Sequence, residues 1–547
     1  MQFSNIYSLF RAQCDKYRER DVFYTRDGDG WKPQTWGEFE DKVHDLACAL
    51  LAKGLTKRAS VAILAGNVPE WTICDIAAIA AGGVGVGIYP TSSTEQCEFI
   101  VRHSDAEFLF VDTLKQYEKL RGTNGSASNL KQIICIEDGG LAAFLDFGRT
   151  NRERYLGAVE SIGYTADAAD TAIMVYTSGT TGNPKGAMLS HKYILNSVES
   201  LRRSVPIFDS DVSLSYLPGC HVAERISGIY NRLYNGAPAY FVDDLSRLYE
   251  YMIEVKPTVF ASLPRFFEKI HAKTVATGGA STDDPQLLKD ALGGRVRLLT
   301  SGGAPLPLEI ADYFSRNGLP ILQAYGLTEN ICVAFNTVSE HRFGTVGKPM
   351  PMCLVCLAGD GEILVKSEMM FSGYYKEPER SAEMFDANGW LKTGDLGSID
   401  EDGFLRITGR KKEIIVLSTG KNIAPALVEN YVKESHLISH CFLFGDGRSY
   451  CVALITLNEA ELTAFARSNG IAAANISVLI RHETVQAAVD QTVAAANERV
   501  SRSEQIKKYT ILEHDFSPAA DEVTPTMKLK RSIVAANYKK ILEKMYE

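Results

Sequence analysis

The sequence lacks several features that mark other classes of protein. Its eleven cysteines are scattered without CxxC spacing, which argues against both a zinc site and a disulfide framework. No N-terminal segment joins a basic start to an apolar run, as a secretion signal would. Apolar runs such as 76–88 contain glycines and are shorter than the roughly 20 residues of a membrane span. We therefore expect a reduced, cytoplasmic protein.

An excess of positive charge is also missing. The 547 residues contain 58 Lys and Arg against 67 Asp and Glu, a net charge of −9. Affinity for a phosphate backbone depends on clustered basic residues, so this balance argues against a nucleic-acid-binding protein. The chain is 45% apolar and long enough for two or more domains with a large core.

A Walker-type nucleotide loop is absent as well. That signature ends in Gly-Lys followed by Ser or Thr, whereas Gly347-Lys348 is followed by Pro349 and Gly420-Lys421 by Asn422. A different stretch, 176–191, has the composition that phosphate binding needs. It follows the apolar run 171–175, a predicted buried strand, and we expect a helix to begin near Ser190.

The loop between that strand and that helix combines glycines, hydroxyls and one lysine. Glycines let the backbone approach an anion, hydroxyls donate hydrogen bonds, and the lysine adds positive charge. The residues that we expect to contact phosphate are Thr177, Ser178, Gly179, Thr180, Thr181, Gly182 and Lys185.

Almost letter for letter, the stretch 176–191 resembles the signature loop of the adenylate-forming superfamily, which includes acyl-CoA synthetases, luciferases and peptide-synthetase adenylation domains. Other segments resemble this family in the right order. Ser301-Gly302-Gly303 resembles its glycine segment facing adenine and acyl group. In 323–329, the resemblance implies that Tyr325 stacks on adenine, that Gly326 belongs to the nucleotide site, that Thr328 touches phosphate, and that Glu329, with Thr180, holds Mg²⁺. Alternatively, Glu329 is an acidic residue in the first turn of a helix.

Further motifs follow toward the C-terminus. Asp395, in Trp390-Leu-Lys-Thr-Gly-Asp, matches the family position that accepts hydrogen bonds from the ribose hydroxyls, and Arg410 matches a second nucleotide contact. Lys412 falls on the hinge of the small domain. Gly420, followed by Lys421, lies in the loop that lines the pantetheine tunnel for CoA. Without these neighbours, Asp395 would be interpreted as a turn residue.

Lys528, in Val523-Thr-Pro-Thr-Met-Lys, matches the lysine that bridges the substrate carboxylate and the α-phosphate. A basic run of this kind is otherwise a solvated surface. His221, in Ser215-Tyr-Leu-Pro-Gly-Cys-His, resembles a residue of the acyl site of fatty-acyl-CoA synthetases, where it lies beside the carboxylate. Here Gly219-Cys220 departs from the commoner Leu-Ser or Leu-Ala, and a structural role for His221 stays open.

Short apolar runs, such as the predicted strands 60–64 and 451–457, alternate with helical stretches along the chain, which predicts an α/β protein with parallel or mixed sheets covered by helices. We expect the adenylate-forming fold, with a large N-terminal AMP-binding domain over residues 1–409 and a small mobile α+β lid over 410–547.

The resemblance implies an enzyme that joins a long-chain fatty acid to coenzyme A through an acyl-adenylate, with ATP and CoA as substrates and Mg²⁺ as cofactor. Several alternatives stay open: a ligase for a different carboxylic acid, an acyl-AMP ligase that loads a carrier protein, luciferase-like oxidation, and a fatty-acid binding or uptake protein with a vestigial nucleotide site. Peripheral membrane association is compatible with a fatty substrate, and the sequence gives no oligomeric state.

Overall fold

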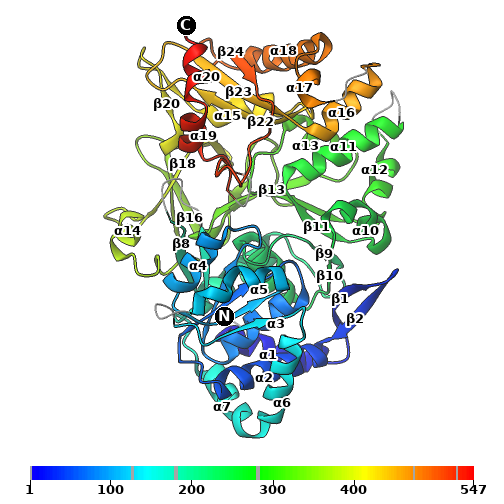
Figure 1. The fold of residues 1–547 in the computed structure, drawn as a ribbon, viewed down its shortest axis with the longest axis vertical. Helices are drawn as coiled ribbons and strands as arrows, with labels where there is room; N and C mark the ends of the chain where they lie inside the picture. Colours follow the sequence, from blue (N-terminus) through cyan, green and yellow to red (C-terminus); the bar gives the residue numbers. More distant parts are fainter. Residues whose placement is uncertain (1–2, 125–128, 178–182, 279–283, 472–474, 525–527) are drawn as a thin grey trace. The chain divides into compact units, whose positions relative to one another are not determined.

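The computed structural model describes residues 3–124, 129–177, 183–278, 284–471, 475–524 and 528–547, which divide into two compact units (Figure 1). Unit 1 contains residues 1–304, 311–355 and 365–391, and unit 2 contains 305–310, 356–364 and 392–547. Four elements include a change from one unit to the other: α13 (Leu308–Arg316), β16 (Cys353–Leu357), β17 (Glu362–Ser367) and β18 (Leu391–Ile399).

The central sheet of unit 1 has six strands in the order β6-β5-β3-β4-β7-β8. The first five are parallel, and β8 runs antiparallel to β7. β3 is buried at every position, as expected for a parallel strand covered on both faces. The strands are β3 (Ser60–Leu64), β4 (Val84–Ile88), β5 (Ala106–Val111), β6 (Gln132–Cys135), β7 (Thr171–Thr177) and β8 (Lys185–Ser190).

Two further sheets lie in unit 1. One has the order β2-β1-β10-β9, with β1 (Asp21–Asp27), β2 (Gly30–Thr35), β9 (Ser213–Ser215) and β10 (Ala239–Phe241). The other has the order β11-β12-β13-β14-β15, with β11 (Val259–Ser262), β12 (Leu298–Ser301), β13 (Ile321–Leu327), β14 (Asn330–Phe335) and β15 (Lys348–Pro349).

The helices of unit 1 agree with the predicted alternation of helices and strands, which confirms the α/β class. The first helix, α1, is amphipathic, and its large apolar side chains are buried. The helices are α1 (Ile6–Tyr17), α2 (Trp36–Ala52), α3 (Pro69–Ala80), α4 (Thr94–His103), α5 (Leu114–Leu120), α6 (Gly140–Thr150), α7 (Arg152–Thr165), α8 (His191–Ser204), α9 (Asn231–Asn235), α10 (Leu248–Val255), α11 (Pro264–Gly278), α12 (Pro285–Ala291) and α14 (Pro378–Glu383), with short η1 (Arg121–Asn124), η3 (Leu245–Arg247) and a π-helix, η2 (Ala223–Tyr230).

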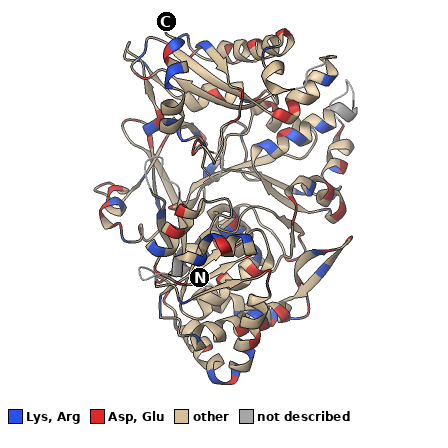
Figure 2. Ribbon diagram, in the orientation of Figure 1, with Lys and Arg blue, Asp and Glu red and all other residues tan. Residues whose placement is uncertain are grey.

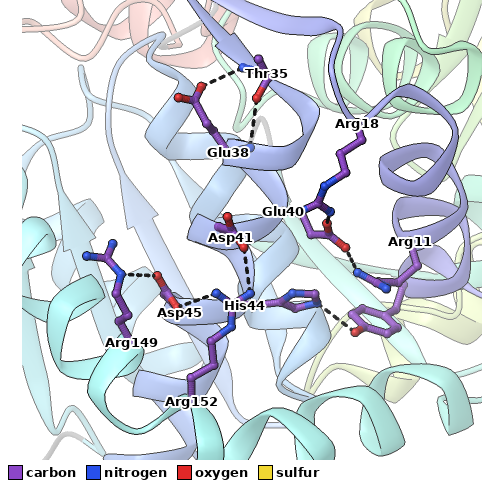
Figure 3. A network of polar contacts seen from close by, with 11 residues as sticks. Arg11, Arg18, Thr35, Glu38, Glu40, Asp41, His44, Asp45, Arg149 and Arg152 are labelled. Atoms are coloured by element: carbon purple, nitrogen blue, oxygen red, sulfur yellow. Dashed lines mark hydrogen bonds and ion pairs between the residues drawn. The ribbon is translucent and has the colours of Figure 1, made fainter.

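Helix α2 is held between α1 and the α6–α7 pair by a polar network (Figure 3). On one side the carboxylate of Glu40 forms ion pairs with Arg11 of α1 and with Arg18. The distance to the guanidinium of Arg18 is 2.6 Å. On the other side the carboxylate of Asp45 forms ion pairs with the guanidinium groups of Arg149 of α6, at 3.2 Å, and Arg152 of α7, at 3.5 Å. The acidic residues of α2 therefore fix its neighbours on both sides.

Two buried histidines connect α1 to the rest of unit 1. The ring Nδ1 of His191 accepts the backbone N–H of Ile6 at 3.2 Å, and Nε2 of His44 lies 3.1 Å from the hydroxyl of Tyr7. Burial is the main cause that lowers the pKa of both histidines to about 4 from 6.5, and the charge of Arg11 adds to this effect at His44. Both rings are therefore neutral in the folded protein at neutral pH.

This predicts an acid-sensitive fold. Between pH 6.5 and 4 the unfolded chain binds more protons at these two histidines than the folded chain does. Their contribution to the free energy of unfolding is therefore complete above pH 6.5 and declines as pH falls toward 4. Each histidine should account for about 3 kcal/mol across that window. His191→Asn keeps an acceptor for the N–H of Ile6 and should flatten the pH dependence of the urea unfolding free energy. An unchanged dependence in both His191→Asn and His44→Gln would contradict the prediction.

Unit 2 is built around a sheet with two apolar faces. Its strands are β22 (Ile438–Phe444), β23 (Cys451–Leu457) and β24 (Ile506–Ile511), in that order. Alternate residues of β23 face opposite sides: Cys451, Ala453 and Ile455 belong to one apolar cluster, Val452 and Leu454 to the other. The period of two thus buries both faces of the strand.

Short strands and helices of up to 16 residues make up the rest of unit 2. They are β18 (Leu391–Ile399), whose first residue belongs to unit 1, and β19 (Leu405–Arg410), η4 (Lys411–Glu413), β20 (Ile415–Val416), β21 (Asn422–Ile423), α15 (Pro425–Val432), α16 (Glu459–Ser468), α17 (Ile476–Leu479), α18 (Glu483–Glu498), α19 (Arg531–Asn537) and α20 (Lys539–Lys544).

Surface charge and thiols agree with the composition. Figure 2 shows acidic and basic residues interspersed along the helices of each unit. All eleven cysteines lie among the described residues, and each carries a free thiol. Within the described part of the chain, no helix has the length and apolar character needed to cross a bilayer.

Candidate active site

The predicted phosphate loop connects two antiparallel strands. β7 leads into it and β8 leads out, with Thr177 opposite Lys185. Ser178, Gly179, Thr180, Thr181 and Gly182 lie outside the described residues. The predicted helix begins at His191, where the Ser190 hydroxyl caps it by accepting the N–H of Tyr193. The strand β8 between loop and helix was not predicted.

The glycines Gly302 and Gly303 follow β12 directly. Gly303 has φ +78°, which side chains rarely adopt, so glycine is required at this turn. A Cβ at Gly302 would lie 3.6 Å from the carbonyl oxygen of Ala324 on the neighbouring strand β13. The glycine segment therefore lies beside the strand that carries Tyr325.

Thr328 and Glu329 form the connection of a hairpin between β13 and β14, which carries the half-buried Tyr325 on β13. Glu329 is therefore not in the first turn of a helix, and that alternative is wrong. A Cβ on Gly326 would come within 1.9 Å of the carbonyl oxygen of Ile331, so only glycine fits there.

Helix α8 fixes this hairpin through one side chain. The hydroxyl of Tyr193 donates to the carbonyl oxygen of Thr328 at 3.0 Å and accepts the N–H of Ile331 at 3.0 Å. Because α8 begins just after β8, the same helix follows the phosphate loop and holds the predicted metal-binding turn.

Glu329 fits the requirements of a magnesium carboxylate. It is 8% exposed, and the hydroxyl of Tyr374 donates to its Oε1. In the part of the chain that the structure describes, no cluster of three His, Cys, Asp or Glu side chains could hold a metal by itself. Mg²⁺ usually takes one or two carboxylates together with phosphate oxygens and waters, so a single buried carboxylate beside a phosphate loop suits it.

His221 lies just before the π-helix η2, and its Nδ1 accepts the N–H of Ala223 at 3.2 Å. Its ring is also 6.4 Å from that of Tyr89, centroid to centroid. The unusual Gly219 beside it is explained by packing, because a Cβ there would lie 2.8 Å from the ring of Trp71. His221 therefore has a structural contact, which is compatible with either predicted role.

In unit 2, Asp395 and Arg410 are cross-strand partners on β18 and β19. The guanidinium Nε of Arg410 donates to Asp395 Oδ1 at 2.9 Å, and the Asp395 side chain is 7% exposed. The turn before Asp395 is held separately, since the N–H of Gly394 donates to the buried carboxylate of Glu362 at 2.9 Å. The predicted ribose-binding motif is thus held by hydrogen bonds at both its backbone and its side chain.

Lys528 lies within the electrostatic reach of that pair. Desolvation by the surrounding protein is the main effect that lowers the pKa of its ammonium, and Arg410 lowers it further, while Asp395 and Glu413 oppose the shift. Part of the side chain is nevertheless exposed to solvent. The fold therefore brings together three predicted site residues that are far apart in sequence: Asp395, Arg410 and Lys528.

The predicted hinge and CoA residues lie on the surface of unit 2. Lys412 is exposed in η4, next to Lys411, which pairs with Asp360 at 2.6 Å and Glu362 at 2.7 Å. Gly420 and Lys421 are exposed in the turn between β20 and β21, where Gly420 has φ +76°.

The sequence interpretation missed three residues that orient these groups: Tyr193, Glu362 and Tyr374. Tyr193 contacts the predicted Thr328, Tyr374 contacts the predicted Glu329, and Glu362 contacts Gly394 just before the predicted Asp395. In each case the two segments are distant in sequence. Glu362 and Tyr374 each follow a glycine, Gly361 and Gly373, that has positive φ and marks a turn. These glycines are the sequence features that could have indicated the two positions.

Fold and site together define an enzyme that binds a nucleotide, and the chain belongs to the AMP-binding enzyme family. The family model matches residues 10–375, and the model of the AMP-binding enzyme C-terminal domain matches residues 412–547. The predicted superfamily is thereby confirmed.

Among curated relatives, the chain is 34% identical to long-chain-fatty-acid–CoA ligase FadD15 of Mycobacterium bovis, over 96% of this chain and 95% of the relative. It is 30% identical to long-chain-fatty-acid–CoA ligase ACSBG2 of Xenopus laevis, over 99% of this chain and 84% of the relative. The solved structure of the anthranilate CoA ligase AuaEII in complex with anthranoyl-AMP shares the fold, with a TM-score of 0.79 at 20% identity, covering 98% of this chain and 97% of that one.

Proposed function

We propose that this enzyme ligates a long-chain fatty acid to coenzyme A, using ATP and releasing AMP and pyrophosphate. The observation that supports adenylation is that Lys528 lies close to Asp395 and Arg410 in unit 2. The fatty substrate rests on the names of the relatives, both long-chain-fatty-acid–CoA ligases that match nearly the whole chain.

In the first step the fatty-acid carboxylate attacks the α-phosphate of ATP, and pyrophosphate leaves. Negative charge accumulates on the α-phosphate oxygens, so a cation there lowers the barrier. Lys528 would supply that cation, and Asp395 would bind the ribose hydroxyls. Tyr325 would stack on the adenine. Gly326, Gly302 and Gly303 would line the nucleotide site. Mg²⁺ held by Glu329 and Thr180 would neutralise phosphate charge. His221 would lie beside the fatty-acid carboxylate.

In the second step the CoA thiol attacks the carbonyl carbon of the acyl-adenylate, and AMP leaves. A thiol with a pKa of about 8.5 is a few per cent thiolate at neutral pH, so no dedicated base is required. We assign Gly420 and Lys421 to the pantetheine path. Rotation of a C-terminal domain, residues 410–547, against residues 1–409 about Lys412 would exchange Lys528 for the CoA loop between the two steps.

The nucleotide products test the reaction. With a fatty acid, ATP and Mg²⁺, the enzyme should form AMP and pyrophosphate, and AMP release should depend on CoA. Formation of ADP and orthophosphate would refute adenylation. AMP release with a carrier protein but not with CoA would instead support carrier loading, and acids from C2 to C20 would give the chain length.

Asp395→Asn should weaken ATP binding by about 10- to 100-fold, because charge-assisted hydrogen bonds contribute roughly 1.5 to 3 kcal/mol. The turn itself should survive, since Glu362 holds Gly394 independently of Asp395. Isothermal titration with ATP measures the effect. Wild-type affinity in the folded variant would mean that Asp395 is a turn residue.

We also propose a cytoplasmic enzyme that associates peripherally with membranes to obtain its apolar substrate. Sedimentation with phosphatidylcholine vesicles, with and without embedded palmitic acid, tests this association, and recovery of the enzyme in the supernatant in both cases would contradict it.

A further inference from the structure

Tyr374 contacts two of the predicted site residues at once. It is 4% exposed, and its hydroxyl donates to Oε1 of Glu329. The ammonium of Lys185, at the exit of the phosphate loop, lies 4.9 Å from the centroid of the Tyr374 ring. A cation at this distance from an aromatic ring is attracted to it. One side chain thus joins the phosphate-loop lysine to the predicted metal carboxylate.

The backbone around Tyr374 is bonded to both partners. The N–H of Phe371 donates to the carbonyl oxygen of Glu329 at 2.9 Å, and Tyr374 itself forms an antiparallel bridge with Ala187 of β8. Ser381 accepts the N–H of Tyr374 through its hydroxyl at 2.8 Å. The bonds to β8 are Ser372 N–H to Met188 O at 2.9 Å, Met188 N–H to Gly373 O at 2.9 Å and Tyr375 N–H to Gly186 O at 2.8 Å.

The chemistry of the phenol suits a fixed donor. The phenol is buried and its hydroxyl donates to the carboxylate of Glu329, so it is a neutral donor held in one place. A carboxylate has about four lone-pair sites, so one bond from the phenol fixes its orientation and leaves acceptor capacity for a cation. Glu329 is thereby oriented before any ligand binds.

We propose that Tyr374 is the positioning residue of the metal and phosphate site, orienting Glu329 with its hydroxyl and Lys185 with its ring. This inference rests on the proposed function, in which Glu329 holds Mg²⁺ and Lys185 contacts phosphate. Tyr374 itself touches neither substrate in this proposal.

Two substitutions separate the hydroxyl from the ring. Tyr374→Phe removes the bond to Glu329 and keeps the ring under Lys185, whereas Tyr374→Leu removes both. Isothermal titration with ATP, with and without Mg²⁺, gives the gain in ATP affinity due to the metal. Tyr374→Phe should reduce this gain about 5- to 10-fold and leave metal-free ATP binding unchanged. Tyr374→Leu should also weaken metal-free ATP binding about threefold.

The neighbouring tyrosine provides a matched control. The hydroxyl of Tyr375 donates to Asp105 at 2.8 Å, away from Glu329, so Tyr375→Phe should keep the wild-type gain. The proposal is overturned if Tyr374→Phe keeps that gain, or if Tyr375→Phe loses as much. The variant Tyr374→Phe preserves the shape of the core, and a thermal melt verifies its folding.

A third variant distinguishes failure of this proposal from failure of the proposed function on which it rests. If Glu329→Gln loses the metal-dependent gain while Tyr374→Phe keeps it, the role of Tyr374 alone is refuted. If Glu329→Gln keeps the gain, the magnesium assignment of the proposed function fails and the Tyr374 proposal fails with it.

Discussion

Replacing Lys528 by alanine is expected to slow acyl-adenylate formation at least about 100-fold while thioester formation from supplied acyl-AMP stays near the wild-type rate. The ammonium lies in the electrostatic field of Asp395 and Arg410, so it is placed to interact with charge that develops on the α-phosphate of a nucleotide bound by these residues. Folding should be unaffected, since the substitution removes a positive charge that Arg410 already disfavours. Pyrophosphate release and acyl-CoA formation from acyl-AMP measure the two steps separately.

Lys530 provides the matched control, because it lies two residues further along and pairs with Asp521. Lys530→Ala should leave both steps unchanged. Lys421→Glu should do the reverse of Lys528→Ala and slow the thioester step alone. Gly420 is a poorer site for that test, since its φ of +76° means that any side chain would strain the turn. Equal loss of both steps in Lys528→Ala and Lys421→Glu would refute an alternating C-terminal domain.

The elements that the sequence predicted well are those with strong local patterns. The predicted strands 60–64 and 451–457 coincide residue for residue with β3 and β23, because a strand buried on both faces is a nearly continuous apolar run. The helix after the phosphate loop also begins as predicted, since Ser190 is a strong capping residue.

Other features depended on tertiary contacts that no local pattern reveals. β8 was missed because its Lys-Gly start resembles a loop, and it is a strand through pairing with β7 and with the segment around Tyr374. The hairpin turn at Glu329 resembles a helix start, yet Tyr193 of α8 holds it as a turn. Gly219 departed from its family motif for a similar reason, since Trp71 fills the space.

The core beneath the phosphate-loop strand contains an ion pair that sequence inspection also missed. Arg225 of η2 and Asp75 of α3 are both completely buried. Besides its contacts with Asp75, Arg225 donates to the carbonyl oxygen of Met174 on β7 at 3.3 Å, and Tyr230 donates to Asp75 at 2.8 Å. Gly85 on β4 makes room, because a Cβ there would overlap the Asp75 carboxylate.

Asp75→Ala is therefore expected to lower the free energy of unfolding by about 3 to 5 kcal/mol, because it leaves the Arg225 charge buried without its partner. The double variant Asp75→Leu with Arg225→Met should recover most of that loss, since it removes both charges and keeps the volume. Glu98→Ala is the control: its pair with Arg102 is long, at 3.8 Å, and partly exposed, so the change should stay within about 0.5 kcal/mol. Urea unfolding of the three variants measures these differences. The prediction is wrong if Asp75→Ala loses less than about 1 kcal/mol, or if the double variant is as unstable as the single one. Either result would mean that Arg225 stabilises the fold through Met174 and Trp71 rather than through its charge partner.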